Sequence, residues 1–522
     1  MELPPDWQLA VRALALAVPA VFLLASLFVT RARAFRRANL VTGAAVGLAA
    51  LVATGSAFSA SASDVTLGVR LDLATSVMLM LVTTIGLIIA RYSRNYLRGE
   101  PGAGRYVCWL LATLGSVSLL VIADNLLVIA IAWFATSITL HQLLTFYDRT
   151  AALVAAHKKF LVSRLADVCL WSGIGLVYFT VGSLDLDAIG VWVAAQDALP
   201  PLLQAAAVLF VVAACLKSAQ LPFHGWLTQV MEAPTPVSAL LHAGVVNIGG
   251  FLMIRLAPLM MHASIAQTLL IAIGLTTTVL AALVMTTRVS IKVALAWSTC
   301  AQMGFMLVQC GLGAWHLALL HIVAHSLYKA HAFLRSGSTV EAWRVQDITG
   351  PSGPAAPARL AMVGAVAVGA VALVTLAGTF DVSTVALSLI VGLSLVPMLR
   401  RGLEAGVRPV ARAALQSAGI VALYFGWHAL ASHLMPEIAT ATAPLVGWIL
   451  VALGFVGLFA IQSVLRADPN GALARRLHPW LFNGFHLDER FTRLTFRIWP
   501  PRLQPRTARA PIGVGEPLEA QA

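Results

Sequence analysis

Apolar segments recur along most of the chain and are joined by short polar connections. Each is close to the length of about 20 residues that an α-helix needs to cross the hydrocarbon core of a membrane. The pattern predicts an all-α, polytopic transmembrane helix bundle of about 13–15 helices, with the transmembrane domain at residues 1–465. The expected spans are 9–30, 39–60, 71–90, 107–123, 125–146, 160–182, 201–218, 237–259, 265–286, 291–311, 314–334, 358–378, 382–399, 414–434 and 444–465.

Composition supports a chain that lives in the lipid bilayer. Hydrophobic residues make up 59% and charged residues 11%, too little charge to cover the surface of a soluble enzyme. The net charge of +13 does not indicate nucleic-acid binding, because the basic residues fall in loops rather than on one amphipathic face. The five cysteines show no paired metal spacing, and no Gly-rich nucleotide loop is present. We therefore expect a transporter subunit without a cofactor, not a redox enzyme.

The loops that are rich in lysine and arginine fall on one side of the predicted bundle. Cytoplasmic loops carry this excess, so the N-terminus is predicted outside and the C-terminus inside. The first apolar segment is long enough to span and its arginines follow it, which predicts a retained helix rather than a cleaved signal. Residues 466–522 are predicted to be a basic cytoplasmic tail, partly disordered. The basic loops are 31–37, 91–105, 149–159, 335–344 and 400–412.

Lys217 is a charge inside an apolar stretch, and helix-breaking prolines follow it. Pro222, Pro234 and Pro236 predict a discontinuous helix near residues 217–236, and His242 follows the break. Irregular backbone at membrane depth must face protein or water, and a buried lysine can exchange a proton as a counter-charge approaches or leaves. We interpret the segment as the centre of an ion path. The alternatives are a lysine that snorkels to the interface or forms a static ion pair.

His321, His325 and Lys329 are spaced four residues apart, so they share one face of the helix expected at 314–334. Histidines exchange protons near neutral pH, which favours a proton relay. A pair of ordinary buried histidines is the plainer alternative. A zinc site is weaker still, because no acidic or thiol ligand accompanies them.

Arg164 and Asp167 are three residues apart in the expected span 160–182, so they can form an ion pair. The pair is either structural, or Asp167 is the counter-charge of Lys217. Glu232, in the broken segment, and Lys292, at the start of a span, are further candidate members of the relay. Asp72 and Asp124 lie near helix ends on the predicted outer side, where capping or solvation is expected. 

Six segments together resemble the antiporter-like, proton-translocating subunits of respiratory complex I and of Mrp-type sodium/proton antiporters. The resemblance covers roughly residues 68–350 and implies that Lys217, His321, His325 and Lys329 belong to a central chain of charged groups. His242 and Glu232 also match motif positions. The segments are RLDLATSVMLMLVTTIGLIIARYSRNYLRGE, LVIADNLLVIAIAW, HKKFLVSRLADV, KSAQLPFHGWLTQVMEAPTPVSALLHA, IKVALAWSTCAQMGFM and HIVAHSLYKAHAFLRSGS.

Departures from that family's pattern indicate a particular branch. Phe134 replaces the usual glutamate after Trp133, Gln229 replaces the aspartate of the WLPDAM segment, and no room remains for the long lateral helix of complex I. With its basic tail, the chain resembles the membrane subunits of DAB inorganic carbon transporters. That resemblance implies a bacterial inner-membrane protein that couples an ion gradient to a soluble, zinc-bearing, carbonic-anhydrase-like partner, DabA. A higher-order assembly is compatible with it.

Two other classes remain open. A cation/proton antiporter or respiratory proton-pumping subunit would use the same lysines and histidines. A membrane anchor without transport would tolerate their loss, but each charged residue costs about 2.5–3.5 kcal/mol at the bilayer centre on insertion scales, which argues for a function.

Overall fold

The computed structural model describes residues 5–29, 33–58, 67–147, 149–230, 233–337, 382–405, 407–434 and 445–500. Within these ranges the protein is all-α, with isolated β-bridges at Val69–Ala123 and Asn125–Asp185 as its only extended pairing. The predicted fold class, an all-α polytopic bundle, is confirmed. Eleven helices of the described part are long and apolar enough to cross a membrane.

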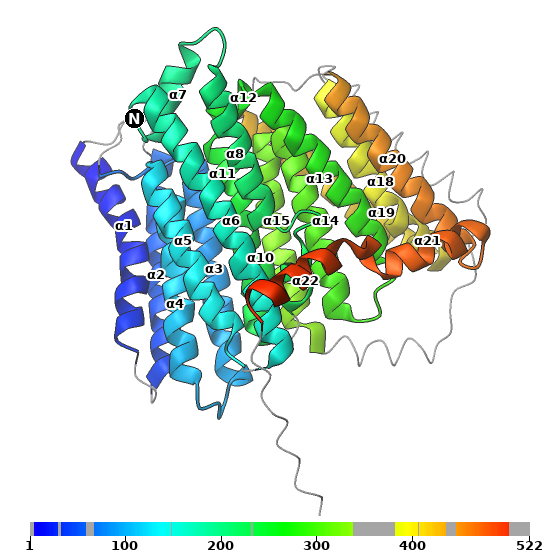
Figure 1. Cartoon of the computed structure of the whole chain (residues 1–522), viewed down its shortest axis with the longest axis horizontal. Coiled ribbons are helices and arrows are strands. Elements are labelled where there is room, and N and C mark those ends of the chain that lie inside the picture. The colour runs from blue at the N-terminus through cyan, green and yellow to red at the C-terminus, as the bar shows by residue number, and fades with distance from the viewer. Residues whose placement is uncertain are drawn as a thin grey trace, which may run out of the picture.

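The first six helices form one end of the bundle (Figure 1). Here α1 packs on α4 and α2, and α5 packs on α4 and α6. Their apolar faces pack together in one buried core. The helices are α1 (Pro5–Leu27), α2 (Ala34–Phe58), α3 (Leu73–Tyr96), α4 (Ala103–Ile122), α5 (Leu126–Leu144) and α6 (Thr150–Val181).

The middle of the chain contains both broken and continuous helices. The long helices α13 and α14 pack against each other, α8 packs on α6, and α10 packs on α15. The elements are α7 (Leu186–Ala194), α8 (Pro201–Lys217), α9 (Gly225–Thr228), α10 (Thr235–Ala243), η3 (Val245–Asn247), α11 (Ile248–Arg255), α12 (Ala257–Met261), α13 (Ser264–Met285), α14 (Ile291–Gly311) and α15 (Trp315–Leu334).

The C-terminal elements close the opposite end of the bundle and then return across it. In Figure 1 the orange α21 and the red α22 run across the middle helices, on the side away from α7 and α12. We call residues 472–499 the C-terminal strap. The elements are α18 (Val382–Ala405), α19 (Val407–Leu434), α20 (Leu445–Ala467), α21 (Ala472–Phe482), η5 (Gly484–His486) and α22 (Leu487–Ile498).

The expected spans coincide with helices, apart from 358–378, which lies outside the described residues. The largest boundary error is at α6, which begins at Thr150, ten residues before the expected span, and α19 begins seven residues early, at Val407. Lys158 and Lys159 suggested a polar connection, but both side chains are buried in the helix. A second difference is α7, which lies in the connection expected at 183–200. In the tail, residues 472–498 form helices that pack on the bundle, while 501–522 lie outside the described residues.

Candidate ion-translocation site

The predicted discontinuous helix is present. Helix α8 ends at Lys217, and helical structure resumes in α9 and α10. Polar partners satisfy the freed backbone, as membrane depth requires: Gln220 N–H donates to Cys215 O (3.1 Å) and Leu221 N–H donates to the Thr277 hydroxyl (3.2 Å). The helix break is therefore stabilised by hydrogen bonds within the protein interior.

Lys217 shares one carboxylate with a second cation. Its Nζ lies 2.6 Å from Asp167 Oδ1, and Arg164 Nη2 lies 2.8 Å from Asp167 Oδ2. Lys217 Nζ also lies 4.2 Å from the ring centroid of Trp133. The Lys217 side chain is only 6% exposed, so it does not snorkel to an interface. The structure thus brings the predicted Arg164, Asp167 and Lys217 together, with more positive than negative charge.

At Phe134, where the resemblance predicts a glutamate, the chain presents an aromatic face. The guanidinium carbon of Arg164 lies 4.1 Å from the Phe134 ring centroid and 4.8 Å from that of Phe160. Cations are attracted to such faces, so aromatic rings hold Arg164 where a carboxylate would be expected. Behind this cluster, buried Lys159 donates to the Ser137 carbonyl (2.8 Å) and hydroxyl (3.0 Å).

The second predicted group lies on α15, facing α10 and α14. His321 Nδ1 lies 2.8 Å from Gln309 Oε1, and Lys329 donates to Leu295 O at 2.9 Å. The rings of His321 and His325 are 6.0 Å apart. The predicted stripe of titratable groups therefore exists and points into the bundle.

His242 connects the broken helix to this stripe. His325 Nε2 lies 3.2 Å from the carbonyl oxygen of His242, and His242 Nδ1 lies 3.2 Å from the Thr299 hydroxyl. One turn further along the break, Asn247 donates to the Ser326 hydroxyl at 2.8 Å. Two elements distant in sequence thus meet through polar contacts.

Several buried polar atoms of this region have no hydrogen-bond partner among the described residues, including Gln220 Oε1, His242 Nε2 and His321 Nε2. Buried polar atoms are normally satisfied, by protein or by ordered water. Ordered water would complete the hydrogen bonding of these atoms.

Two candidates remain, Lys292 and Glu232. Lys292 is half-buried at the start of α14 and donates to the Thr235 hydroxyl at 3.2 Å. Glu232 lies outside the described residues. No group of three or more His, Cys, Asp or Glu side chains is arranged to hold a metal ion in the described ranges.

The C-terminal strap adds a carboxylate that sequence patterns did not reveal. Asp488 Oδ2 lies 2.6 Å from Lys158 Nζ and accepts a hydrogen bond from Gln229 Nε2 at 2.7 Å, while Lys158 donates to Gln229 Oε1 at 2.8 Å. Gln229 is the position where the resemblance predicts an aspartate. Asp488 therefore supplies a negative charge at that place from a distant part of the chain.

Further contacts fix the strap on the bundle. The rings of Trp499 and His157 stack with centroids 4.0 Å apart, and Arg288 donates to Leu481 O at 2.7 Å. Gly225 allows Asp488 to approach, because a Cβ there would lie 1.6 Å from Asp488 Oδ1. The strap thus contacts α6, α9 and the α13–α14 connection.

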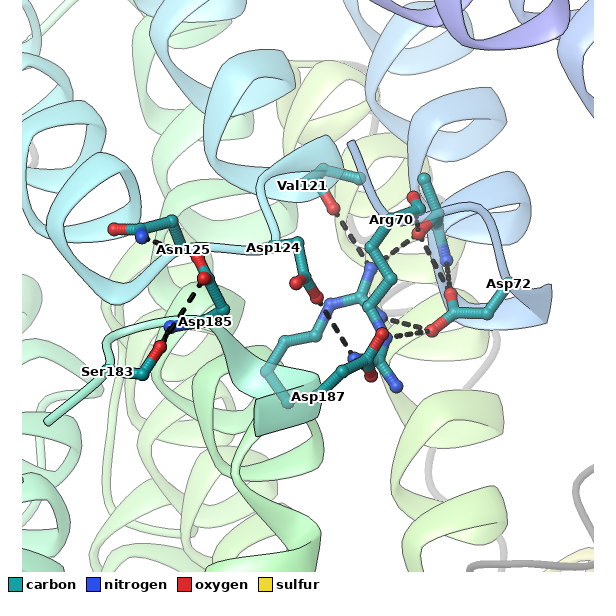
Figure 2. Close-up of polar contacts among 10 residues, drawn as sticks. Arg70, Asp72, Val121, Asp124, Asn125, Ser183, Asp185 and Asp187 are labelled. Carbon is teal, nitrogen blue, oxygen red and sulfur yellow. Dashed lines mark hydrogen bonds and ion pairs between the residues drawn. The ribbon is translucent and has the colours of Figure 1, made fainter. Parts of the chain in front are cut away.

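On the side of the bundle away from the C-terminal strap, near α7, Arg70 forms a cluster of ion pairs that we call the clasp (Figure 2). It pairs with Asp72 (3.0 Å), Asp124 (3.1 Å) and Asp187 (2.5 Å), which lie on three different segments. Asp72 also pairs with Arg255 and caps α3 by accepting from Thr75 N–H. The capping prediction for Asp72 is confirmed. The prediction that Asp124 is solvated is wrong, because its side chain is fully buried and pairs with Arg70.

The clasp shifts the pKa values of its members. Burial and then the charge of Asp187 raise the pKa of Asp124 to about 6, against the opposing effect of Arg70. The pKa of Asp72 lies well below its usual range, because Arg255 and Arg70 outweigh its burial. The pKa of Arg70 is raised, since its three carboxylates outweigh the effect of burial.

This fold, with a broken helix beside buried lysines and histidines, defines an antiporter-like membrane subunit. The family "NADH:quinone oxidoreductase/Mrp antiporter, TM" matches residues 123–391, and the family of the complex I chain 5 N-terminus matches residues 58–107. The chain belongs to the NADH:quinone oxidoreductase/Mrp antiporter family.

Within that family, the chain is similar to two proteins named as probable inorganic carbon transporter subunits. It is 40% identical to DabB of Hydrogenovibrio crunogenus over 82% of this chain and 83% of that protein. It is 38% identical to DabB2 of Halothiobacillus neapolitanus over 94% of both. The predicted resemblance to the DAB subunits is confirmed.

A solved structure of the Mrp complex from Dietzia sp. DQ12-45-1b has the same fold. The TM-score is 0.55 at 26% identity, and the match covers 94% of this chain. This chain spans 56% of the length of that one. NADH-quinone oxidoreductase subunit L of Mycobacterium tuberculosis is 35% identical over 53% of this chain and 44% of that protein.

Proposed function

We propose that this chain is the membrane subunit of an energy-coupled inorganic carbon uptake system. It conducts protons or other cations, and their movement drives a soluble, carbonic-anhydrase-like, zinc-bearing partner of the DabA type. The similarity to DabB proteins over most of both chains supports the substrate class, CO2 or bicarbonate. The membership of the antiporter family supports the ion pathway.

The observation that carries the pathway is the sharing of Asp167 by Arg164 and Lys217. One carboxylate balances one of the two cations, so neutral Lys217 leaves Arg164 and Asp167 balanced and protonated Lys217 adds a charge. An unbalanced charge in a low-dielectric interior is costly. A proton on Lys217 is thus favoured when Arg164 moves away from Asp167, and it is released toward the histidine stripe when Arg164 returns to that carboxylate.

The route continues from Lys217 across the broken helix to His242, His325 and Lys329. Proton transfer needs donors and acceptors within hydrogen-bond reach or joined by water. His325 already contacts the backbone of His242, and the unpaired atoms Gln220 Oε1 and His321 Nε2 provide positions for bridging water.

The C-terminal strap offers a physical link from this route to a partner. Lys158 and Lys159 are adjacent on α6; Lys158 pairs with Asp488 of the strap, and the Arg164–Asp167 pair lies further along the same helix. We place the strap on the cytoplasmic side with the C-terminus, and the N-terminus outside, in agreement with the basic loops. A shift of charge on α6 then changes the strap surface that meets the partner.

The energy involved is sufficient for accumulation. One elementary charge that moves through 100 mV releases about 2.3 kcal/mol. Since about 1.4 kcal/mol corresponds to a factor of ten, one proton per turnover biases the partner's reaction by tens of fold.

Two experiments test the proposal. Purification of the chain from its native membrane should recover one large zinc-bearing soluble protein. Lys217→Ala and Lys329→Ala, each still bound to that partner, should abolish bicarbonate uptake in cells. Normal uptake by both variants would refute the relay. Recovery of several polytopic subunits, with sodium-dependent proton exchange in vesicles, would instead identify an antiporter or respiratory subunit.

A further inference from the structure

A groove lined by arginines lies between the start of α2 and the end of α3. Its volume is about 1000 Å³, and the turn at residues 97–103 closes one side. The arginines lie within or next to the ends of α2 and α3, which are long and apolar enough to cross a membrane. They are Arg33, Arg36, Arg91, Arg94 and Arg98.

Among the residues that the structure describes, these arginines have no anionic partner. Within the described ranges, none of the five forms an ion pair or a side-chain hydrogen bond. Of the described residues that line the groove, Glu100 is the only acidic one, and its Oε1 is 3.5 Å from the Tyr147 hydroxyl. Five like charges that line one concavity repel one another and concentrate a positive potential there. An anion is the ligand that relieves this repulsion.

The groove also has an apolar side. Phe35, Leu40 and Leu97 line it together with the arginines, and Leu40 is 65% exposed. The next exposed leucine of α2, Leu51, is 56% exposed, so one side of α2 presents apolar side chains to the membrane. Near the groove on α3, the rings of Tyr92 and Tyr96 stack 5.8 Å apart, and tyrosines concentrate at the membrane–water interface.

We propose that this groove binds the phosphodiester headgroup of an anionic membrane phospholipid. Guanidinium groups bind phosphate through paired, charge-assisted hydrogen bonds, and basic pockets between transmembrane helices suit such headgroups. A free phosphate would satisfy the arginines but leave the apolar side unused. An acidic protein segment is disfavoured, because the groove opens beside the membrane-facing Leu40.

The test uses the full chain, purified in mild detergent and titrated with phosphatidylglycerol or phosphatidylcholine while binding is followed by native mass spectrometry. Each arginine near an anionic lipid contributes enough that removing two, in Arg91→Gln/Arg94→Gln, should weaken phosphatidylglycerol binding about 30-fold. Both side chains are exposed, so the fold should be unaffected, as an unchanged unfolding midpoint in phosphatidylcholine would verify. The control Arg475→Gln/Arg476→Gln removes two exposed arginines of α21 and should bind the lipid as the unaltered chain does.

Four results would overturn the proposal. The first is equal binding of phosphatidylglycerol and phosphatidylcholine, and the second is an equal loss in the α21 control, which would indicate unspecific surface charge. The third is displacement of the lipid by inorganic phosphate at equal concentration, which would indicate a site for a free anion. If the groove variant keeps its lipid but loses a co-purified soluble partner, the groove is a protein-docking surface and the lipid proposal fails.

Discussion

The contact between Asp488 and Lys158 yields a quantitative prediction for Asp488→Asn. Lys158 is fully buried, its Nζ is 2.6 Å from the carboxylate, and Asp488 itself is 20% exposed. Hydrogen bonds to charged groups contribute about 1.5–3 kcal/mol. Asparagine preserves the shape and a hydrogen-bond acceptor but removes the charge, so we expect a loss of about 2 kcal/mol.

That loss should appear as local opening of the C-terminal strap rather than as global unfolding, since proteins open in separate units. A loss of about 2 kcal/mol corresponds to a detached strap populated about 30-fold more often. Hydrogen exchange of peptides from residues 484–499, followed by mass spectrometry in detergent, should accelerate by this factor. Peptides of α3 and α4 should be unchanged.

The matched control is Glu489→Gln, the neighbouring carboxylate of α22, which is 54% exposed and pairs with His486. Exposed pairs contribute little, so its exchange should stay close to that of the unaltered chain. Adding Lys158→Met to Asp488→Asn should have little further effect, because the pair acts as one unit. An exchange rate for Asp488→Asn within about twofold of the unaltered chain would refute the assignment of this pair as the anchor of the strap.

Three further predictions concern other parts of the molecule. Asp167→Asn leaves Arg164 and Lys217 without their carboxylate, and removal of one partner of a buried pair costs about 3–5 kcal/mol; we expect loss of ion transport and a lower unfolding midpoint, and normal transport would contradict the shared-carboxylate site. Gly225→Ala should speed exchange in the strap as much as Asp488→Asn does, because the new Cβ would occupy the position of Asp488 Oδ1; unchanged exchange would show that the strap is held elsewhere. The raised pKa of Asp124, from 3.8 to about 6, means that its protonated form stabilises the native state and that this stability is lost as the pH rises from about 4 to 6. Asp124→Asn should therefore remove this decline, which amounts to up to about 3 kcal/mol in the free energy of unfolding across the window and is read from the unfolding midpoint at each pH. An unchanged pH dependence would contradict the burial of an ionised Asp124.

The fold was predictable where a local signal determines structure. The length and hydrophobicity of segments such as 291–311 are sufficient for a membrane helix, and α14 covers the same residues. The start of α6 was not predictable, because Lys158 and Lys159 read as a polar connection. Their burial depends on Asp488, 330 positions away, and on the Ser137 carbonyl. A local sequence window contains neither partner.

In the candidate site too, local spacing was predictable from the sequence, whereas contacts between distant residues were not. The helical spacing of Arg164 and Asp167, and of His321, His325 and Lys329, predicted which side chains share a face. The pairing of Asp167 with Lys217 was one of two interpretations until the geometry brought the atoms to 2.6 Å. The contact of Asp488 with Gln229 had no sequence signal, because the strap reads as a basic tail, although the strong amphipathicity of LDERFTRLTFRI indicates a helix with one packed face.

The two departures from the family pattern now have a common physical explanation. Phe134 and Gln229 each stand where the resemblance predicts a carboxylate, and the absence of two negative charges beside Arg164 and Lys158 would leave both cations unbalanced. The positive charge of Arg164 is stabilised by the Phe134 ring and by the ion pair with Asp167, which Lys217 shares. Around Lys158 it is restored by Asp488, so the negative charge resides on the strap instead of the broken helix. A carboxylate that belongs to the broken helix is always present, whereas one on the strap is present only while the strap is bound. The charge balance of α6 is therefore linked to strap docking. Linkage is reciprocal: a partner that binds only the docked strap changes the affinity of the α6 site for a cation by the same factor by which that cation changes the affinity for the partner.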